Sequence, residues 1–345
     1  MYFAFAVEIS GIILVLEYKN HKVDKMKIIK IGVLLLLGLI LGMSAHAQEY
    51  PNKPIHIIVP FPPGGGADVL MRPLSKKLSE LLGQPIILDN KPGANGNIGA
   101  IFTAKSAPDG YTLLVGNSSI PISVSLYSNL GYDPMKDLTM VGLMTIAPST
   151  LASNPLFMAK TIPELISQAK ANPGKINYGS AGSGSTPHLG MEMFSLATGT
   201  KFTHIPYKGS GPAVTAALGG EVDILITNTS TILSQVQAKK LNPIAVTSLK
   251  RSPILPDVPA IAETLPGFEV RTWYGLFGPG NLPKEIIIKL NTAIVQAINT
   301  PEIKAQLIKS GYEPETTSSD EFVQLMKDDI VSWGKVVKTS GAKID

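Results

Sequence analysis

The chain has 345 residues, of which 44% are hydrophobic and 16% charged, with 30 Lys and Arg against 26 Asp and Glu. This composition excludes an intrinsically disordered chain, and the length predicts about two domains. No run of five or more basic residues occurs, so the formal charge of +4 provides no electrostatic footprint for nucleic acid. We therefore expect a folded protein whose partner is a small molecule and not a nucleic acid.

The first 47 residues are expected to be removed from the mature protein. From Met26, two lysines precede an apolar run at residues 31–43, and the small-x-small pattern Ala45-His46-Ala47 follows. Because these 13 apolar residues are fewer than the roughly 20 that span a bilayer, residues 26–47 are interpreted as a cleavable secretory signal peptide. Residues 1–25 are interpreted as the product of a mis-set start codon, with an uncleaved N-terminal anchor as the alternative. The signal peptide predicts a location in the bacterial periplasm.

Strand-like and helix-like segments alternate in the mature chain. A short β-branched run at 55–60 ends in a glycine-bearing loop at 61–68, and leucines at helical spacing follow until Gly83. Asp68 is predicted to cap this helix, and Gly83 to end it in a left-handed conformation. Further strands are predicted at 85–88, 112–116, 176–179, 222–227 and 244–247. The alternation predicts an α/β fold with a parallel sheet.

The strand, glycine loop and helix arrangement occurs a second time. The strand at 176–179 leads into the loop at 180–186, and a helix stripe then runs to Gly199. Further helices are predicted within 93–107, at 212–218, from Pro283 onward, and after the capping box that Ser318 and Glu321 form. Each half of the chain therefore contains one glycine loop that precedes a helix.

Loops of this kind favour anions. Glycine lets backbone N–H groups approach a ligand closely, and the following helix places about half a positive charge at its start. Two such loops are suited to holding a carboxylate through backbone donors and hydroxyl groups. Phosphate is the rival anion, but neither loop carries a Walker motif or the Gly-x-Gly-x-x-Gly pattern, because Pro187 stands at the third glycine position.

Patterns for catalysis, metals and cofactors are largely missing from the sequence. There is no Gly-x-Ser-x-Gly nucleophile motif, no His-Glu-x-x-His and no cysteine. No catalytic residue, metal or cofactor is therefore predicted. Phe61 and Tyr207 are candidates for the walls of an apolar slot, with a role in the core as the alternative. Asn117 and Asn228 each follow a predicted strand and are candidates for polar ligand contacts.

The residues also carry a resemblance to a known family. The matching segments are Tyr50-Pro51-x-Lys53-Pro54-Ile55, Val59-Pro60-Phe61-x-Pro63-Gly64-Gly65-x-x-Asp68, Asn90-Lys91-Pro92-Gly93-Ala94-x-Gly96, Pro108-Asp109-Gly110-Tyr111-Thr112-Leu113, Gly182-x-Gly184-Ser185-x-x-His188-Leu189, Pro206-Tyr207-Lys208-Gly209, Gly219-Gly220-x-Val222-Asp223 and Leu255-Pro256-Asp257-Val258-Pro259. Together they cover nearly the whole mature chain, and they resemble the tripartite tricarboxylate transporter receptors, also called the Bug family. An Ala at 260, where Thr is common, and a third glycine at Gly66 are the departures.

The resemblance implies a type II periplasmic-binding-protein fold, in which two α/β lobes joined by a hinge of crossing strands close on a small organic carboxylate. Lobe 1 is expected at 48–146 and 270–345, and lobe 2 at 147–269. The expected function is that of a monomeric periplasmic receptor that performs no reaction and delivers its ligand to the membrane subunits of a tripartite tricarboxylate-type transporter. The predicted ligand-binding residues are Phe61, Gly65, Gly66, Ala67, Asp68, Asn117, Ser180, Ala181, Gly182, Ser185, Thr186, Tyr207 and Asn228.

Two alternative functions remain open from the sequence. The first is a sensor, in which the same closed form docks on a membrane signalling protein. The second is an exported hydrolase with Ser180 or Ser185 as its nucleophile.

Overall fold

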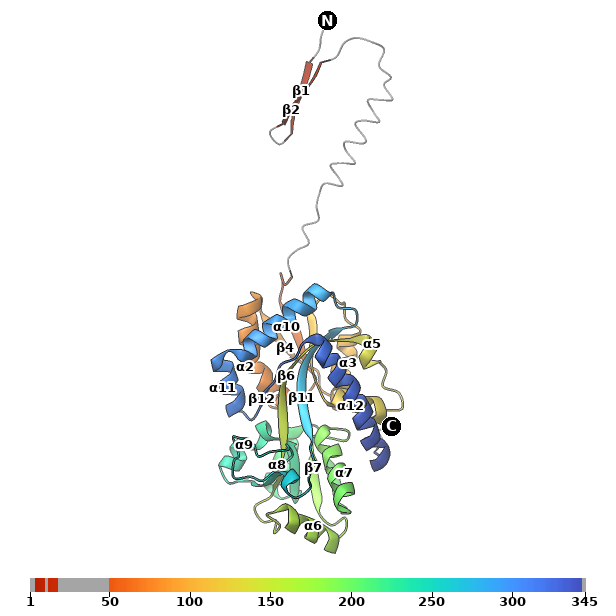
Figure 1. Cartoon of the computed structure of the whole chain (residues 1–345), viewed down its shortest axis with the longest axis vertical. Helices are drawn as coiled ribbons and strands as arrows, with labels where there is room; N and C mark the ends of the chain where they lie inside the picture. Colours follow the sequence, from red (N-terminus) through yellow and green to blue (C-terminus); the bar gives the residue numbers. More distant parts are fainter. Residues whose placement is uncertain (1–3, 10–11, 18–49, 343–345) are drawn as a thin grey trace. The chain divides into compact units, whose positions relative to one another are not determined.

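Residues 4–9, 12–17 and 50–342 are described by the computed structural model (Figure 1). The chain divides into two units, Met1–Tyr50 and Pro51–Asp345. The first contains an antiparallel strand pair, β1 (Ala4–Ile9) and β2 (Ile12–Glu17). The signal peptide predicted at 26–47 lies outside the described residues and stays a prediction.

The second unit is built on a mixed sheet. In its first part, β3 (Ile55–Val59) pairs in parallel with both β4 (Ile86–Asn90) and β5 (Thr112–Asn117). Isoleucines of β3 are fully buried, as a strand covered on both faces requires. Antiparallel to β5 runs β11 (Arg271–Pro279). The predicted parallel pairing is therefore confirmed for β3 to β5, and the sheet is mixed where β11 joins it.

The second part of the sheet repeats the parallel arrangement. Here β7 (Asn177–Ser180) pairs in parallel with β8 (Thr203–Pro206) and with β9 (Ile224–Asn228). The remaining strand of this part is β10 (Asn242–Val246), which runs antiparallel to the long strand described next.

One long strand, β6 (Leu138–Ser153), belongs to both parts of the sheet. Its residues 138–148 pair with β11, and residues 149–153 pair with β9. Figure 1 shows β6 and β11 side by side where they pass from one group of elements to the other. These two strands are the connections that cross between the two parts. The bounds predicted for the two lobes stay a prediction.

Helices flank the sheet, and none in the described part of the chain is long and apolar enough to cross a membrane. Those that follow parallel strands are α2 (Gly66–Leu82), α3 (Asn97–Ala104), α4 (Ser119–Leu126), α7 (Thr186–Thr198), α8 (Ser210–Gly219) and α9 (Thr229–Gln237). The other short elements are η1 (Ala94–Gly96), α5 (Pro134–Asp137), α6 (Ile162–Ala171), η2 (Ile261–Glu263) and β12 (Glu313–Pro314). The C-terminal helices are α10 (Lys284–Asn299), α11 (Pro301–Lys309) and α12 (Ser319–Ser340).

Most of the predicted helix ends are confirmed. Gly83 and Gly199 take left-handed conformations with φ of 67° and 63° at the ends of α2 and α7. A capping box forms at the start of α12, where Ser318 and Glu321 bond reciprocally. The predicted cap at Asp68 is wrong, because α2 begins at Gly66 and places Asp68 in its first turn.

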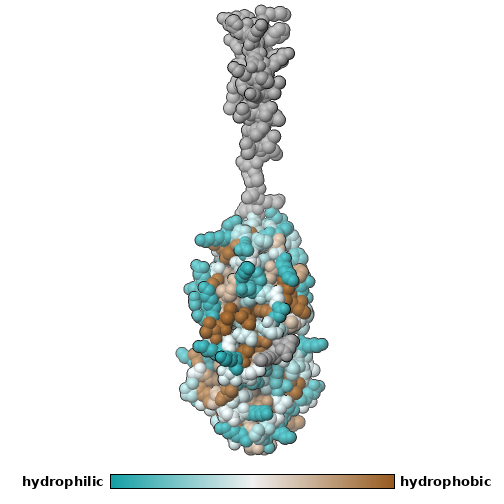
Figure 2. Space-filling view, turned by 90° about the vertical axis from the view of Figure 1, so that its right-hand side faces the viewer, coloured by the Kyte–Doolittle hydropathy of each residue, from teal (hydrophilic) through white to brown (hydrophobic). Residues whose placement is uncertain are grey.

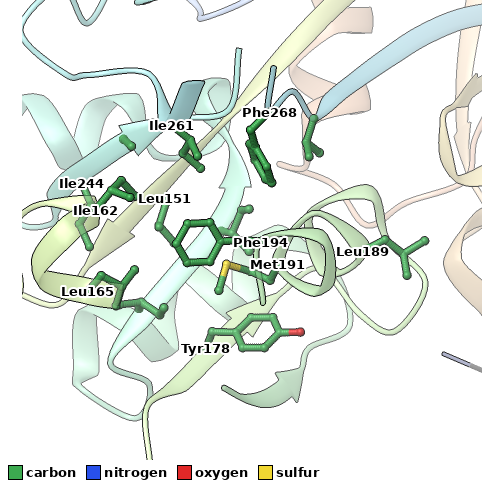
Figure 3. Packing of buried hydrophobic residues seen from close by; sticks show 14 of the residues in the cluster. Leu151, Ile162, Leu165, Tyr178, Leu189, Met191, Phe194, Ile244, Ile261 and Phe268 are labelled. Carbon is green, nitrogen blue, oxygen red and sulfur yellow. The ribbon is translucent and has the colours of Figure 1, made fainter. Parts of the chain in front are cut away.

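Two hydrophobic clusters hold the parts of the sheet together. Figure 3 shows Phe194 of α7 at the centre of one cluster, surrounded by Leu151, Met191 and Tyr178. Trp333 and Val337 of α12 join this cluster, whereas Phe322 and Met326 of the same helix join the cluster around β5, β6 and β11. Helix α12 therefore packs against both parts of the sheet. On the face shown in Figure 2, polar residues surround scattered hydrophobic ones.

Candidate functional site

A cavity lies at the carboxyl ends of the parallel strands. Its volume is about 60 Å³. Its lining consists of Phe61, Pro62, Pro63, Gly65, Gly66, Ala67, Asn95, Asn117, Ser119, Ala181, Ser185, Thr186, Pro187, Gly209, Ser210, Gly211, Pro212, Asn228, Thr272 and Tyr274. None of these side chains is charged, so recognition here depends on neutral donors and backbone dipoles.

Five helices begin at this cavity. The lining includes the first residues of α2, α4, α7 and α8, and also Asn228, the N-cap of α9. Each helix start carries about half a positive charge and N–H groups that lack partners within the helix. The sequence predicted two such starts, at the glycine loops, and the structure adds three. An uncharged lining surrounded by helix starts favours a negatively charged ligand.

The first glycine loop is held against the crossing strand β11. A methyl group built on Gly66 would lie 2.4 Å from the Tyr274 hydroxyl oxygen, so only glycine permits this approach. The carbonyl of Gly66 accepts a hydrogen bond of 2.6 Å from the Tyr312 hydroxyl. Asp68 accepts a hydrogen bond from the Gly64 N–H at 2.8 Å and pairs with Arg72. Its carboxylate therefore holds the loop and does not line the cavity.

The second glycine loop is held by its own hydroxyl groups. Ser185 caps α7 and donates a hydrogen bond of 2.7 Å to the Gly182 carbonyl oxygen. The backbone φ angles of Gly182 and Gly184 are 126° and 78°, values that residues other than glycine rarely adopt. The Thr186 hydroxyl lies 2.7 Å from that of Ser118, at the start of α4. This buried pair joins a helix start of the first part of the sheet to one of the second.

Both glycine loops line the cavity, and the first loop approaches the loop that precedes α8. A methyl group built on Gly209 would lie 3.5 Å from Cδ of Pro62, which is an ordinary van der Waals distance. At the base, Asn228 donates a hydrogen bond of 2.7 Å to the Tyr274 hydroxyl, and Ser119 donates its backbone N–H to Oδ1 of Asn117 at 3.0 Å. Burial raises the pKa of Tyr274 well above its ordinary value, so its hydroxyl stays protonated.

A pair of stacked imidazoles supports the second loop from behind. The rings of His188 and His204 lie 4.1 Å apart, and burial lowers their pKa values to about 4 and about 3. Both are therefore neutral near pH 7. Nδ1 of His188 accepts a hydrogen bond from the Gly184 N–H, and Nε2 of His204 lies 2.7 Å from Oγ of Ser180. Ser180 is fully buried, and its Oγ also accepts a hydrogen bond from the Gly182 N–H.

Nine of the thirteen predicted ligand-binding residues line the cavity: Phe61, Gly65, Gly66, Ala67, Asn117, Ala181, Ser185, Thr186 and Asn228. Asp68, Ser180 and Gly182 lie in the loops behind the lining. Tyr207 is half-buried and packs against the hydrophobic cluster of α8 and β9. Within the part of the chain that the structure describes, no group of three or more His, Cys, Asp or Glu side chains could hold a metal ion.

The sequence reasoning missed several lining residues. Tyr274 and Thr272 belong to β11, which was not predicted as a strand, and no local motif marks either residue. Asn95 and Ser119 follow β4 and β5, where the carboxyl ends of parallel strands offered a usable signal. The glycine-rich segment 209–212, where α8 begins, is a third loop at the cavity. In the sequence, only the motif that contains Tyr207 indicated a turn there. A cavity of this kind between two parts of an α/β sheet is typical of a small-molecule binding site.

Comparison with known proteins identifies the family. The model of the family described as "Tripartite tricarboxylate transporter family receptor" matches residues 70–342. Protein BugT of Bordetella pertussis is 39% identical over 301 residues, which cover 86% of this chain and 92% of that protein. This chain therefore belongs to the tripartite tricarboxylate transporter receptor family, and the predicted Bug-family resemblance is confirmed.

Two solved structures are also similar. One, described as Rpa4515 of R. palustris with adipate, has a TM-score of 0.82 and 35% identity, and the match covers 85% of this chain and 99% of that one. The other, described as MatC of Rhodopseudomonas palustris with bound malate, has a TM-score of 0.78 and 31% identity, covering 84% and 100%. The predicted two-lobed α/β fold and the role of a solute-binding receptor for a tripartite transporter are thereby confirmed.

Proposed function

We propose that this receptor binds a small organic carboxylate in the cavity between the two glycine loops and carries it through the periplasm to the membrane subunits of its transporter. The observation that carries this proposal is the convergence of five helix starts on a cavity with no charged side chain. The adipate and malate bound by the two similar structures support a carboxylate ligand.

The binding energy follows from the groups that the cavity offers. A hydrogen bond to a charged group contributes roughly 1.5 to 3 kcal/mol. Four or five of them, from helix-start N–H groups and hydroxyls such as that of Thr186, leave about 8 kcal/mol after the costs of association, which is micromolar affinity. Because the lining belongs to both parts of the sheet, a bound acid contacts both and favours the closed arrangement.

No reaction is part of this proposal. Ser180 has an imidazole partner but is fully buried behind the loop, away from the cavity lining. Ser185 lines the cavity. Its hydroxyl donates a hydrogen bond to the Gly182 carbonyl oxygen and accepts one from the backbone N–H of His188. Neither serine has the arrangement in which an exposed hydroxyl meets a base.

A thermal-shift panel on purified residues 48–345 tests the proposal. The panel contains mono-, di- and tricarboxylates, amino acids and aromatic acids, with the corresponding amides as uncharged controls. We expect at least one acid to raise the melting temperature and its amide to leave it unchanged. At a concentration 100 times Kd, a bound ligand stabilises the fold by about 2.7 kcal/mol. No stabilisation by any acid would contradict the proposal.

A further inference from the structure

His188, in the first turn of α7, forms two hydrogen bonds with the second glycine loop. Its backbone N–H donates to Oγ of Ser185 at 3.4 Å, and its ring Nδ1 accepts from the backbone N–H of Gly184 at 3.1 Å. Ser185 and the next residue, Thr186, line the cavity, whereas His188 does not. The imidazole is therefore placed to act on the cavity through the loop.

The direction of the ring's hydrogen bond fixes where its proton lies. A backbone N–H can only donate, so the bond from Gly184 requires an Nδ1 that carries no proton, and the proton of the neutral ring is then on Nε2. Nε2 lies 3.9 Å from Oε1 of Glu192, and the same oxygen accepts a hydrogen bond of 2.9 Å from the Tyr178 hydroxyl. Both sides of the ring therefore suit one tautomer, in which Nδ1 is the acceptor for the loop.

The loop depends on this acceptor. Gly184 is buried and has φ of 78°, and a buried N–H without a partner costs a folded protein free energy. Without an acceptor at Nδ1, Gly184 either stays unpaired or moves to find another partner. Because Ser185 and Thr186 follow it directly, such a movement displaces groups that line the cavity.

A second imidazole holds the other end of the same loop. Nε2 of His204 lies 2.7 Å from Oγ of Ser180, which accepts a hydrogen bond of 3.2 Å from the Gly182 N–H. His204 stacks on His188 at 4.1 Å and on Tyr178 at 4.8 Å. In the described part of the chain, Tyr178, Glu192 and the two imidazoles are the titratable groups of this cluster. A proton on either ring would place a buried positive charge against the other ring, which both hydrogen-bonding and stacking oppose.

We propose that His188 is a positioning residue for ligand binding: the unprotonated Nδ1 of its imidazole holds Gly184, and thereby keeps Ser185 and Thr186 in the arrangement that binds the carboxylate. Protonation turns this acceptor into a donor that opposes the Gly184 N–H and weakens binding. This inference rests on the proposed function, because it concerns the affinity of the cavity for its acid.

Three variants of the mature chain separate the acceptor from the bulk of the side chain. His188→Asn keeps an acceptor oxygen at the place of Nδ1 and does not take up a proton. His188→Leu fills a similar volume without an acceptor. Phe194→Leu is the matched control for stability, because Phe194 is buried on the same helix but lies outside the cavity lining.

Isothermal titration at pH 7 uses the tightest-binding acid of the thermal-shift panel, in which adipate and malate are included. We expect His188→Leu to bind it about 5- to 50-fold more weakly than wild type, and His188→Asn and Phe194→Leu to bind within about threefold. The inference is overturned if His188→Leu binds as wild type does, if His188→Asn loses as much as His188→Leu, or if Phe194→Leu does so.

The pH dependence of binding provides a second measurement. Wild type and His188→Asn are titrated with the same acid from pH 8 to pH 4, so that protonation of the ligand affects both alike. Since burial lowers the pKa of His188 to about 4, the ratio of the two Kd values stays constant above about pH 6 and turns against wild type by about twofold at pH 4. A ratio that does not change with pH overturns the inference.

Nitrogen-15 spectra of the ligand-free protein show the ring protons directly. We expect Nδ1 of His188 without a proton and Nε2 with one near pH 7. A proton on Nδ1 overturns the inference and leaves the proposed function standing. Failure of wild type to bind any carboxylate of the panel overturns the proposed function, and this inference with it.

Discussion

The approach of Gly66 to Tyr274 can be tested by a single methyl group. In Gly66→Ala the added carbon would lie 2.4 Å from the Tyr274 hydroxyl and 3.1 Å from Nδ2 of Asn228, where ordinary contacts begin at 3.4 Å. The hydroxyl must therefore move by about 1 Å, which disrupts its 2.7 Å hydrogen bond with Asn228. Overpacking costs about 1 to 3 kcal/mol, and loss of a buried hydrogen bond costs about 1 kcal/mol more.

We expect Gly66→Ala to lose about 2 to 4 kcal/mol of unfolding free energy, which lowers the melting temperature by about 3 to 6 °C. Circular dichroism measures the melting, and titration with the best acid of the panel is expected to show weaker binding. Gly211→Ala is the matched control, because Gly211 also lines the cavity near a helix start but has no atom within 4 Å of the added carbon. Melting of Gly66→Ala within 1 °C of wild type, with unchanged affinity, would refute this reasoning.

Three further predictions concern stability. Because His188 and His204 are held neutral with pKa values of about 4 and about 3, the unfolded chain binds more protons below pH 6.5. Stability therefore falls as the pH drops from 6.5 toward 4, by about 3 kcal/mol for His188 alone. Melting curves measured across this pH range test the prediction. If the double variant His188→Gln, His204→Gln loses stability with falling pH as steeply as wild type does, the prediction is contradicted. Phe194→Ala is expected to lower the free energy of unfolding, measured in urea, by about 3 to 5 kcal/mol. Leu196→Ala, on the same helix but 51% exposed, should change it by no more than about 0.5 kcal/mol. Equal losses in the two variants would contradict the central place of Phe194 in the hydrophobic cluster. Tyr274→Phe leaves the Asn228 donor unpaired and should cost about 1 to 3 kcal/mol, and an unchanged melting temperature would speak against that bond.

Local sequence signals were sufficient for the glycine loops and their helices. The turn from a β-branched strand into glycines, followed by leucines at helical spacing, defines β3 and α2 without knowledge of the rest of the fold. The same signals located β7 and α7, and the left-handed glycines that end both helices. These features depend on neighbours a few residues away, which is why sequence reasoning reached them.

The crossing strands depend on contacts that sequence reasoning did not capture. The pairing of β6 with β11 joins residues more than 100 positions apart, and β6 changes partners within its length. Tyr274 reaches the cavity only through this pairing, so no local pattern marked it. The start of α2 was misplaced for a related reason. Asp68 is a good cap by residue type, but the cap of α2 is Gly65, three residues earlier, and the helix start is accompanied by the close contact of Gly66 with Tyr274.

The most direct test of the account is a crystal structure of residues 48–345 with the tightest-binding acid of the panel. We predict that one carboxylate of the ligand lies in the cavity, within hydrogen-bond distance of groups from both glycine loops, at Gly66–Ala67 and at Ala181–Thr186. A ligand bound elsewhere, or held by only one of the two loops, would contradict the central claim that the acid is gripped between them.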